Sequence, residues 1–348
     1  MLKIPWKRKQ GTKSYAYLCA RVRAMKSKLL PKEVYPRLMN MEIAEITRFI
    51  EDSEYKKDVD ELAQKYDGAN LIEHALNQNL ALTYRKLLNI SAGESHHLIS
   101  EYFMRWDIWN IKTILRGKRY RATDEEILES VVSAGQFGYH DLISLVHKDA
   151  PEIVETLKQN YPLEEYSEER LDHFENVLDK FYYEKLIEIE AVRNPKTKSH
   201  RLFSDIIRTE IDIKNLKTLF RSAKAGVARE QITDMLIPGG LKLNMIALIK
   251  LAGLSFSEFI ASLRDYPYWD SISGIVTEEM ESLIDVETGM DKYWLEYAAR
   301  ISHYYPLSIV PIMDYILCKK NEVDNIRMIV RGKEVGLSED MIRSKLVL

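Results

Sequence analysis

The sequence is poor in the residues that interrupt regular structure. Among 348 residues, only 14 are glycine and 10 are proline. A protein built from many short elements needs more turn residues, so this composition favours long helices joined by few turns. No alternation of apolar and polar residues runs beyond about four positions, and alternation is the pattern of a half-buried strand. The sequence therefore predicts an all-α fold.

Cysteine is scarce as well. The two cysteines, Cys19 and Cys318, could pair only if the two ends of the chain meet. Disulfides are rare in the cytoplasm, and both residues are flanked by apolar helical sequence. We therefore expect reduced thiols.

Long apolar runs are also missing. The most apolar stretch, 241–254, contains three polar side chains, whereas a membrane span needs about 20 apolar residues. The basic residues 1–9 are followed by the polar stretch 10–14, where a signal peptide would have its apolar core. The expected location is cytoplasmic, with contact to a membrane-embedded partner still possible.

The chain carries no excess of positive charge. Its 50 basic and 53 acidic residues give a net charge of −3. Nucleic-acid-binding proteins usually have a basic surplus on one face, so we expect no nucleic-acid partner.

The chain does contain one ten-residue pattern three times, at 107–116, 212–221 and 322–331. Each copy reads acid, apolar, any residue, Asn, apolar, base, any residue, apolar, apolar, Arg. The period exceeds the roughly 20–50 residues of solenoid repeats and matches a small domain. The predicted organisation is an amino-terminal segment, three helical repeat domains and a closing helix at 338–348. The bounds are 1–30, 31–122, 123–227 and 228–348.

The polar positions of this pattern form the candidate structural site. They are Asp107, Asn110, Lys112 and Arg116, then Asp212, Asn215, Lys217 and Arg221, then Glu322, Asn325, Arg327 and Arg331. A glutamate lies 37, 40 and 38 residues before the three asparagines, at Glu73, Glu175 and Glu287.

Each copy places two bases four residues apart, which repel each other by a few tenths of a kcal/mol on an exposed helix. An anion is therefore expected to face them. The favoured interpretation is a structural salt bridge to the glutamate of the same copy, because Arg pairs well with a partly buried carboxylate. The alternative is an external anion, such as a phosphate or the carboxylates of a partner.

Motifs of catalysis are not found. Gly117-Lys118 and Gly332-Lys333 resemble the end of a phosphate loop, but the earlier Gly and the following Ser or Thr are missing. Neither an H-E-x-x-H motif nor a cysteine cluster is present. We expect a non-enzymatic protein without cofactor, metal or direct nucleotide binding. A free-standing helical adaptor or scaffold remains an alternative, as does, more remotely, a helical enzyme with an acid cluster in a cavity.

Three segments together resemble a known family. Residues 15–25, 105–118 and 210–221 are similar to signatures of the C subunits of the A-type and bacterial V-type ATP synthases, a family that includes the d subunit of the vacuolar proton pump. The resemblance implies a funnel of three similar helical domains around a pseudo-threefold axis, with a central cavity and no catalysis of its own.

The same resemblance implies the partners. A protein of this family caps the cytoplasmic end of the membrane proteolipid rotor ring, receives the central-stalk shaft and transmits torque. It is a peripheral protein and acts as a monomer within a larger complex. The basic segment 3–13 is a candidate for contact with acidic loops or lipid headgroups.

Overall fold

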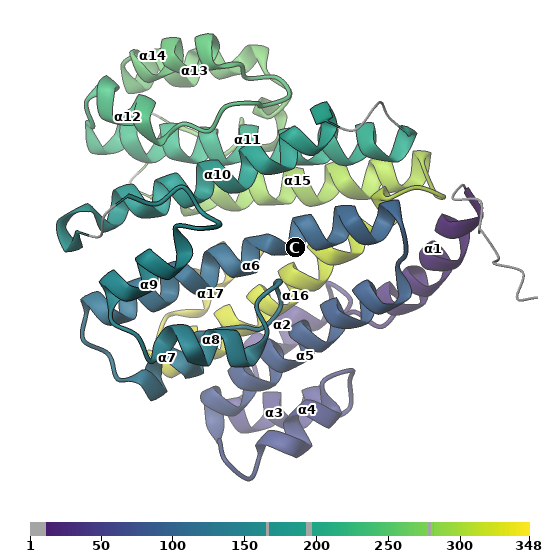
Figure 1. The fold of residues 1–348 in the computed structure, drawn as a ribbon. Helices are drawn as coiled ribbons and strands as arrows, with labels where there is room; N and C mark the ends of the chain where they lie inside the picture. Colours follow the sequence, from purple (N-terminus) through teal and green to yellow (C-terminus); the bar gives the residue numbers. More distant parts are fainter. Residues whose placement is uncertain (1–11, 165–166, 193–196, 278–279, 281) are drawn as a thin grey trace, which may run out of the picture.

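The computed structural model describes residues 12–164, 167–192, 197–277, 280 and 282–348. Figure 1 shows helices throughout this part of the chain, and none of the residues described is in a strand. The all-α prediction is confirmed.

Six long helices form three hairpins. The first helices are α5 (Gly68–Ile90), α10 (Leu171–Val192) and α15 (Ile284–Tyr304). The second helices are α6 (Glu94–Arg119), α11 (Lys198–Ala225) and α16 (Val310–Glu334). We call α6, α11 and α16 the signature helices, because each carries one copy of the ten-residue pattern.

Short helices fill the remainder. The first hairpin is preceded by α1 (Thr12–Lys26), α2 (Val34–Met39), α3 (Ile43–Glu51) and α4 (Lys56–Leu62). Between the hairpins lie α7 (Asp124–Ser130), α8 (Tyr139–Val146), α9 (Ala150–Leu157), α12 (Arg229–Met235), α13 (Met245–Ala252) and α14 (Phe256–Ser262). The chain ends with α17 (Glu339–Lys345), and 3₁₀ turns occur at Glu168–Arg170, Leu263–Asp265 and Trp269–Ser271.

Helix α7 begins where its sequence predicts. The Thr123 hydroxyl accepts a hydrogen bond from the Glu126 amide, and the Glu126 carboxylate accepts one from the Thr123 amide. This capping box satisfies two of the free N–H groups at the helix start. Ser338 caps α17 through the Met341 amide in a similar way. Ala228, a weaker start signal, precedes α12 without a side-chain cap.

The six long helices pack in a closed cycle. Within each hairpin the two helices contact each other, and α6 also contacts α10, while α11 contacts α15. The last signature helix, α16, then packs along α5, so the final hairpin returns to the first. In Figure 1 the yellow α16 accordingly lies beside the blue-violet α5, although they are far apart in the sequence.

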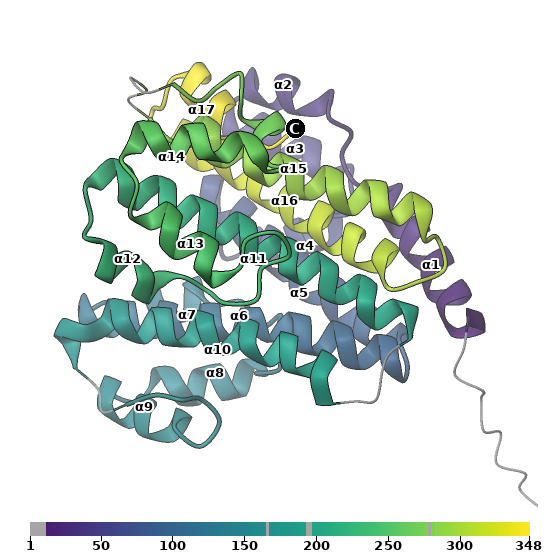
Figure 2. The same ribbon diagram turned by 90° about the horizontal axis from the view of Figure 1, so that it is seen from above.

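The three hairpins join their helices at the same end of the molecule. The last residues of α5, α10 and α15, the first residues of α6, α11 and α16 and the start of α1 are at the right of both Figure 1 and Figure 2. The short helices α7, α9, α12 and α17 lie toward the other end.

The apolar positions of the repeated pattern form core. Ile108, Ile111 and Leu115 of α6 are at most 3% exposed, as their shared helical face predicts. A second, smaller apolar cluster from residues 213–290 packs between α11, helices α12–α14 and the start of α15.

Neither cysteine is in a disulfide. The Cys19 thiol is buried and donates to the Ser308 carbonyl oxygen, and Cys318 is also free. Within the described residues, no helix combines the length and the apolar character that crossing a bilayer requires.

Candidate structural site: three polar corners

The three asparagines make the same pair of hydrogen bonds. In each case the side-chain amide donates to a backbone carbonyl 22 residues later, and its oxygen accepts from the amide of that same residue. Asn110 bonds Val132 at 2.9 Å in both directions. Asn215 bonds Ile237 at 2.7 and 2.8 Å, and Asn325 bonds Val347 at 3.0 and 3.1 Å. Each asparagine thus anchors the segment that follows its signature helix.

The first acid of each copy binds backbone amides. Asp107 accepts from the amides of Gln136 and Phe137 at 2.8 and 2.9 Å. Asp212 accepts from the amides of Lys242 and Leu243 at 2.7 and 3.1 Å. The backbone must come very close to do this. A Cβ atom at Gly135 would lie 2.2 Å from the Asp107 carboxylate, and one at Gly240 would lie 2.0 Å from that of Asp212.

The third acid closes the cycle. Glu322 accepts from the Leu30 amide at 2.5 Å, which lies 292 residues earlier in the chain. Its second oxygen accepts from the Tyr55 hydroxyl at 2.7 Å and the Lys319 ammonium at 2.9 Å. The amino-terminal part of the chain therefore completes the corner of the last signature helix.

A tyrosine hydroxyl bonds the acid of the second and third corners, Tyr161 interacts electrostatically with Asp107 in the first, and none of the three was predicted from the sequence. The Tyr268 hydroxyl donates to Asp212 at 2.5 Å, as Tyr55 does to Glu322. The Asp107 carboxylate further raises the pKa of Tyr161, which burial raises most. Tyr161 follows Asp107 at nearly the same spacing as Tyr268 follows Asp212. This recurrence is the sequence signal that could have identified the two tyrosines.

Burial also perturbs the acids themselves. Desolvation raises the pKa of Asp107 to about 6, against the opposing effect of the two amide bonds. The pKa of Asp212 is raised for the same reason, and its additional bond from Tyr268 opposes the rise. Both carboxylates are buried, and both oxygens of each accept hydrogen bonds from the backbone, so their role is structural.

The glutamates do pair with the arginines of the pattern, but not within their own copies. Arg116 forms a two-pronged ion pair with Glu175 of the second repeat. Arg221 forms one with Glu287 of the third, with both contacts at 2.6 Å. The expectation of a partner in the same copy is therefore wrong, because each signature helix packs against the first helix of the next hairpin.

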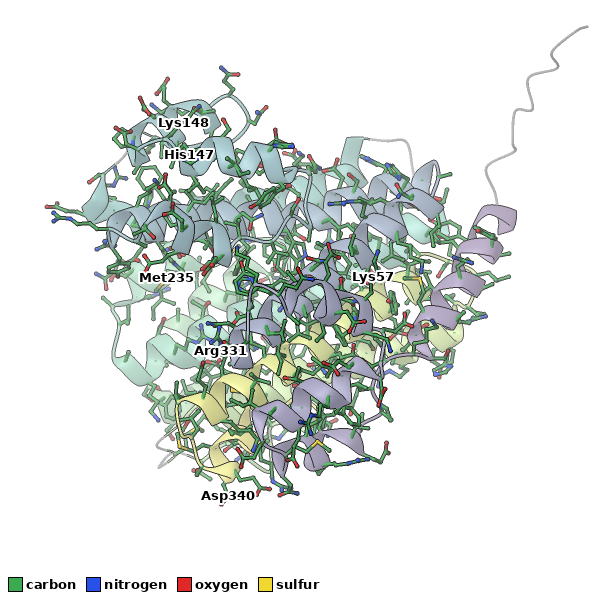
Figure 3. All side chains as sticks on the ribbon, turned by 90° about the horizontal axis from the view of Figure 1, so that it is seen from below. Lys57, His147, Lys148, Met235, Arg331 and Asp340 are labelled. Atoms are coloured by element: carbon green, nitrogen blue, oxygen red, sulfur yellow. The ribbon has the colours of Figure 1, made fainter. Side chains whose placement is uncertain are left out.

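The last copy pairs with the first. Arg331 on α16 binds Glu73 on α5, and Asn70 accepts from the same guanidinium at 2.9 Å. Figure 3 shows Arg331 where the yellow carboxyl-terminal ribbon meets the purple amino-terminal ribbon. The three arginine–glutamate pairs thus link the hairpins in order and close the cycle.

The other base of each copy, four residues before the arginine, follows the same rule. Lys112 binds Asp179 at 2.7 Å, and Lys217 binds Asp291 at 2.5 Å. Arg327 donates to Asn77 at 2.6 Å, so the neutral Asn77 stands where the other two repeats have an aspartate. Internal groups therefore supply the counter-charge, and the repeated bases do not require an external anion.

The asparagine corners yield a direct prediction. Asn110→Ala leaves the amide and carbonyl of Val132 without partners in a buried position. An unsatisfied buried backbone group costs about 1–3 kcal/mol, so we expect a loss of at least that size in the free energy of unfolding. Urea denaturation measures it. The control Asn40→Ala removes only an exposed bond to Pro36 and should change stability by less than about 0.5 kcal/mol. Equal effects of the two changes would contradict the anchoring role.

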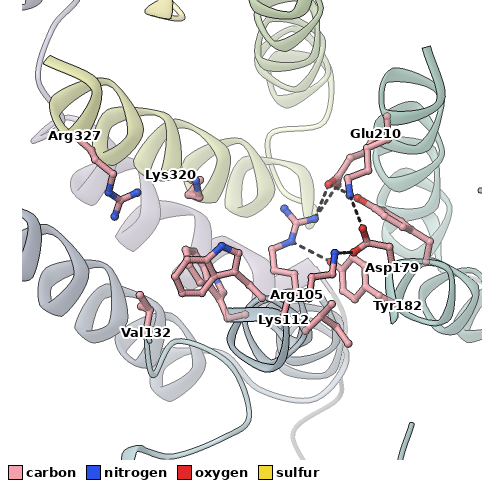
Figure 4. Close-up of a pocket in the computed structure, with 13 residues that line it drawn as sticks. Arg105, Lys112, Val132, Asp179, Tyr182, Glu210, Lys320 and Arg327 are labelled. Carbon is pink, nitrogen blue, oxygen red and sulfur yellow. Dashed lines mark hydrogen bonds and ion pairs between the residues drawn. The ribbon is translucent and has the colours of Figure 1, made fainter. Parts of the chain in front are cut away.

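A pocket lies where the signature helices approach one another. One position of the repeat contributes from all three copies: Arg105, Glu210 and Lys320 each lie two residues before the acid that begins the pattern. All three line this one pocket of about 270 Å³. In Figure 4, Lys320 and Arg327 extend from α16 on one side, and the bonded Arg105 and Glu210 face them. Equivalent positions of the three copies thus meet in one place.

The pocket wall contains apolar and aromatic side chains, and its charged side chains are predominantly basic. Arg105 donates to both oxygens of Glu210 at 2.7 and 2.9 Å, and the Tyr183 hydroxyl donates to the same carboxylate at 2.8 Å. The charged lining consists of the bases Arg105, Lys112, Lys214, Lys320 and Arg327 and the acids Asp179 and Glu210. The side chains that the three copies contribute to the pocket differ in charge, whereas the acid and the asparagine of the corners recur in every copy.

Fold and corners together define a class of helical protein: three hairpins in which each signature helix is fastened to the next hairpin, and the last to the first. The family model described as "ATP synthase (C/AC39) subunit" matches residues 18–345. The chain belongs to this family, and the resemblance seen in its sequence is confirmed. It is an accessory subunit and not an enzyme.

Similar proteins are consistently named as the C subunit of an A-type ATP synthase. The protein of that name from Methanococcoides burtonii is 57% identical over 346 residues, covering 98% of this chain and 96% of the relative. Its counterpart from Methanosarcina mazei is 51% identical over 347 residues, with 98% and 95% covered. The one from Archaeoglobus fulgidus is 38% identical over 338 residues, with 96% of both chains covered.

Proposed function

We propose that this chain is the central-rotor socket of an A-type ATP synthase. It joins the central-stalk shaft to the membrane proteolipid ring on the cytoplasmic face. It thereby transmits torque for ion transport coupled to ATP synthesis or hydrolysis. The family match and the shared name of the relatives support the complex. The observation that carries the socket role is the closed cycle of three hairpins.

The cycle supports a funnel with a pseudo-threefold axis. The three asparagines have matching bonds with one spacing of 22 residues. The residues before the three acids share one pocket, as expected if the signature helices surround a common axis. We therefore propose that repeats 31–122, 123–227 and 228–337 are equivalent units, with 338–348 as the closing helix.

The corner residues are proposed to be architectural. A torque-bearing socket must resist separation of its three parts under a tangential load. Buried hydrogen bonds and two-pronged arginine pairs are directional, so they oppose sliding in a way that apolar packing alone does not. Because every arginine–glutamate pair joins a signature helix to the next hairpin in the cycle, the load spreads around the whole cycle.

The charged side chains of the pocket wall suit the seat of a shaft. A smooth apolar seat would let a coiled coil turn freely, whereas charged groups at fixed angles resist slippage. Lys214 and Lys320 have 42% and 38% of their side chains exposed, so both can reach a partner. We propose that this wall contacts acidic groups at the end of the shaft.

The whole-complex test uses reconstituted vesicles. Complexes assembled with this chain should couple ATP hydrolysis to ion pumping, and complexes assembled without it should hydrolyse ATP without pumping. If pumping stays coupled to hydrolysis in its absence, the rotor role is wrong. If the chain does not co-purify with the proteolipid ring and the ATPase head, the adaptor alternative replaces it.

A second test addresses the pocket wall. The double variant Lys214→Glu/Lys320→Glu should weaken binding of the purified shaft proteins by at least about tenfold, since like charges at an interface cost several kcal/mol. The control Lys57→Glu, on exposed α4 (Figure 3), should leave binding unchanged. Calorimetric titration measures both. Unchanged binding of the double variant would move the shaft seat away from this pocket.

A further inference from the structure

The three hairpin turns are tied into one surface. Tyr15 of α1 donates to Glu94 at the start of α6 at 3.4 Å, and Glu94 also contacts His200 of α11 at 2.5 Å. The ammonium of Lys198, at the start of α11, lies 4.2 Å from the ring centroid of Tyr305, in the α15–α16 turn. The first and second hairpins are thereby joined to the third.

Helix α1 is fastened to the same surface. Arg23 donates to the Pro306 carbonyl at 3.0 Å, and the Cys19 thiol donates to that of Ser308 at 3.4 Å. We call this surface the turn end. It comprises α1, residues 91–94, residues 197–201 and residues 303–308, and it lies at the right of Figures 1 and 2.

The turn end exposes large apolar side chains. Tyr304 is 71% exposed, Leu307 is 49% exposed, and Tyr17 of α1 is 58% exposed. The contacts of α1 with residues 306 and 308 bring Tyr17 to the same region as the other two. Tyrosine is the side chain best suited to a bilayer surface, because its ring is apolar and its hydroxyl stays hydrated.

Basic side chains surround this apolar group. Lys198 and Arg201 in the first turn of α11 are exposed, and so are Arg21 and Arg23 of α1. Of the acids at this end, Glu94 is already bonded to Tyr15 and His200, and Glu188 of α10 is exposed. An apolar centre with a basic rim is complementary to a surface of acyl chains and anionic phosphates.

We propose that the turn end binds directly to a bilayer that contains anionic phospholipid. Tyr17, Tyr304 and Leu307 enter the headgroup region, while Lys198 and Arg201 pair with lipid phosphates. A base near such a surface strengthens binding by roughly fivefold, and exposed rings add to it. This contact is additional to the socket function and orients the molecule with its turns toward the membrane.

The test uses purified protein and protein-free vesicles in a flotation assay. We expect binding to vesicles of equal parts phosphatidylcholine and phosphatidylglycerol, and much weaker binding to phosphatidylcholine alone. Raised salt should reduce the difference, because it screens exposed charges. A protein that ignores the anionic vesicles would overturn the proposal.

Two variants locate the contact. Lys198→Glu/Arg201→Glu should bind anionic vesicles at least about 25-fold more weakly, since two attractions become repulsions. Acids in the first turn of α11 favour the helix dipole, so this variant should fold. Tyr304→Ser/Leu307→Ser removes apolar surface that is mostly exposed and should weaken binding about tenfold at any salt concentration.

The matched control reverses two exposed bases in the first turn of another helix. Lys56→Glu/Lys57→Glu on α4, away from the turn end, should bind as the wild type does. An equal loss in this control would show that only net charge matters and would refute a turn-end contact. Binding to the purified proteolipid ring without binding to vesicles would overturn the lipid contact and assign the surface to protein loops instead. Since the vesicles contain no protein, the vesicle results do not bear on the socket role.

Discussion

Glu210→Leu should lower the free energy of unfolding by about 3–5 kcal/mol, because it strands a largely buried guanidinium. Glu210 is 6% exposed and accepts both hydrogen bonds from Arg105. It also accepts from the Tyr183 hydroxyl, which would lose its partner as well. Urea denaturation followed by circular dichroism measures the change.

Two comparisons separate the stranded charge from loss of the pair itself. Arg116→Ala removes a pair whose arginine side chain is 56% exposed, and such pairs contribute less than about 1 kcal/mol. The double change Arg105→Met/Glu210→Leu removes both charges and should recover much of the loss. If the double variant is no more stable than Glu210→Leu, the cost does not come from an unpaired arginine.

The second large effect is expected where the ends of the cycle meet. Glu322→Leu should also cost at least about 3–5 kcal/mol, because it leaves the buried Lys319 ammonium unpaired. Lys319 and Glu322 have only 3% and 4% of their side chains exposed. The Leu30 amide and the Tyr55 hydroxyl lose their acceptor at the same time.

This variant should also loosen the amino-terminal part of the chain selectively. Limited proteolysis is expected to cut within residues 27–33 before any other site, since the bond from Leu30 to Glu322 anchors that segment. The double variant Lys319→Met/Glu322→Leu should regain stability but not this protection, because no acceptor is restored. Protection of 27–33 in Glu322→Leu would be incompatible with the anchoring role.

The sequence was sufficient for the local features. Sparse turn residues predicted the all-α fold, and the apolar spacing in α6 predicted the buried Ile108, Ile111 and Leu115. The capping box at Thr123 predicted the start of α7. These features depend on residues within one or two helical turns, so a short segment of the sequence is enough to predict them.

The partners of the repeated bases depended on packing between hairpins. The repeat pattern identified Glu175 as a partner for a repeated arginine but assigned it to Arg221, and the structure gives Arg116. Spacing alone cannot tell whether the arginine of a signature helix faces its own hairpin partner or the next hairpin. Each signature helix contacts both, and its arginine binds the glutamate of the next hairpin.

The third corner could not be predicted either, because its partners are also far away in the sequence. Tyr161 and Tyr268 follow their acids at similar spacing, but Tyr55 precedes Glu322 by 267 residues. Residue 30, assigned to a segment outside the repeats, supplies an amide to that corner. A search for repeats along the sequence does not reveal that the amino-terminal residues complete the last repeat, whereas the folded structure shows this contact. The repeat bounds themselves stay a prediction.

The bond between the last hairpin and the first has a consequence for synthesis on the ribosome. Glu73 emerges early, but Arg331 lies 258 residues further on, so this pair cannot form until α16 has been synthesised. Until then the apolar side of α5 that receives α16 stays uncovered. A chain that lacks α16 would therefore leave this apolar surface of α5 exposed, and chaperones and proteases would recognise it. Closure of the cycle of hairpins therefore waits for the synthesis of α16.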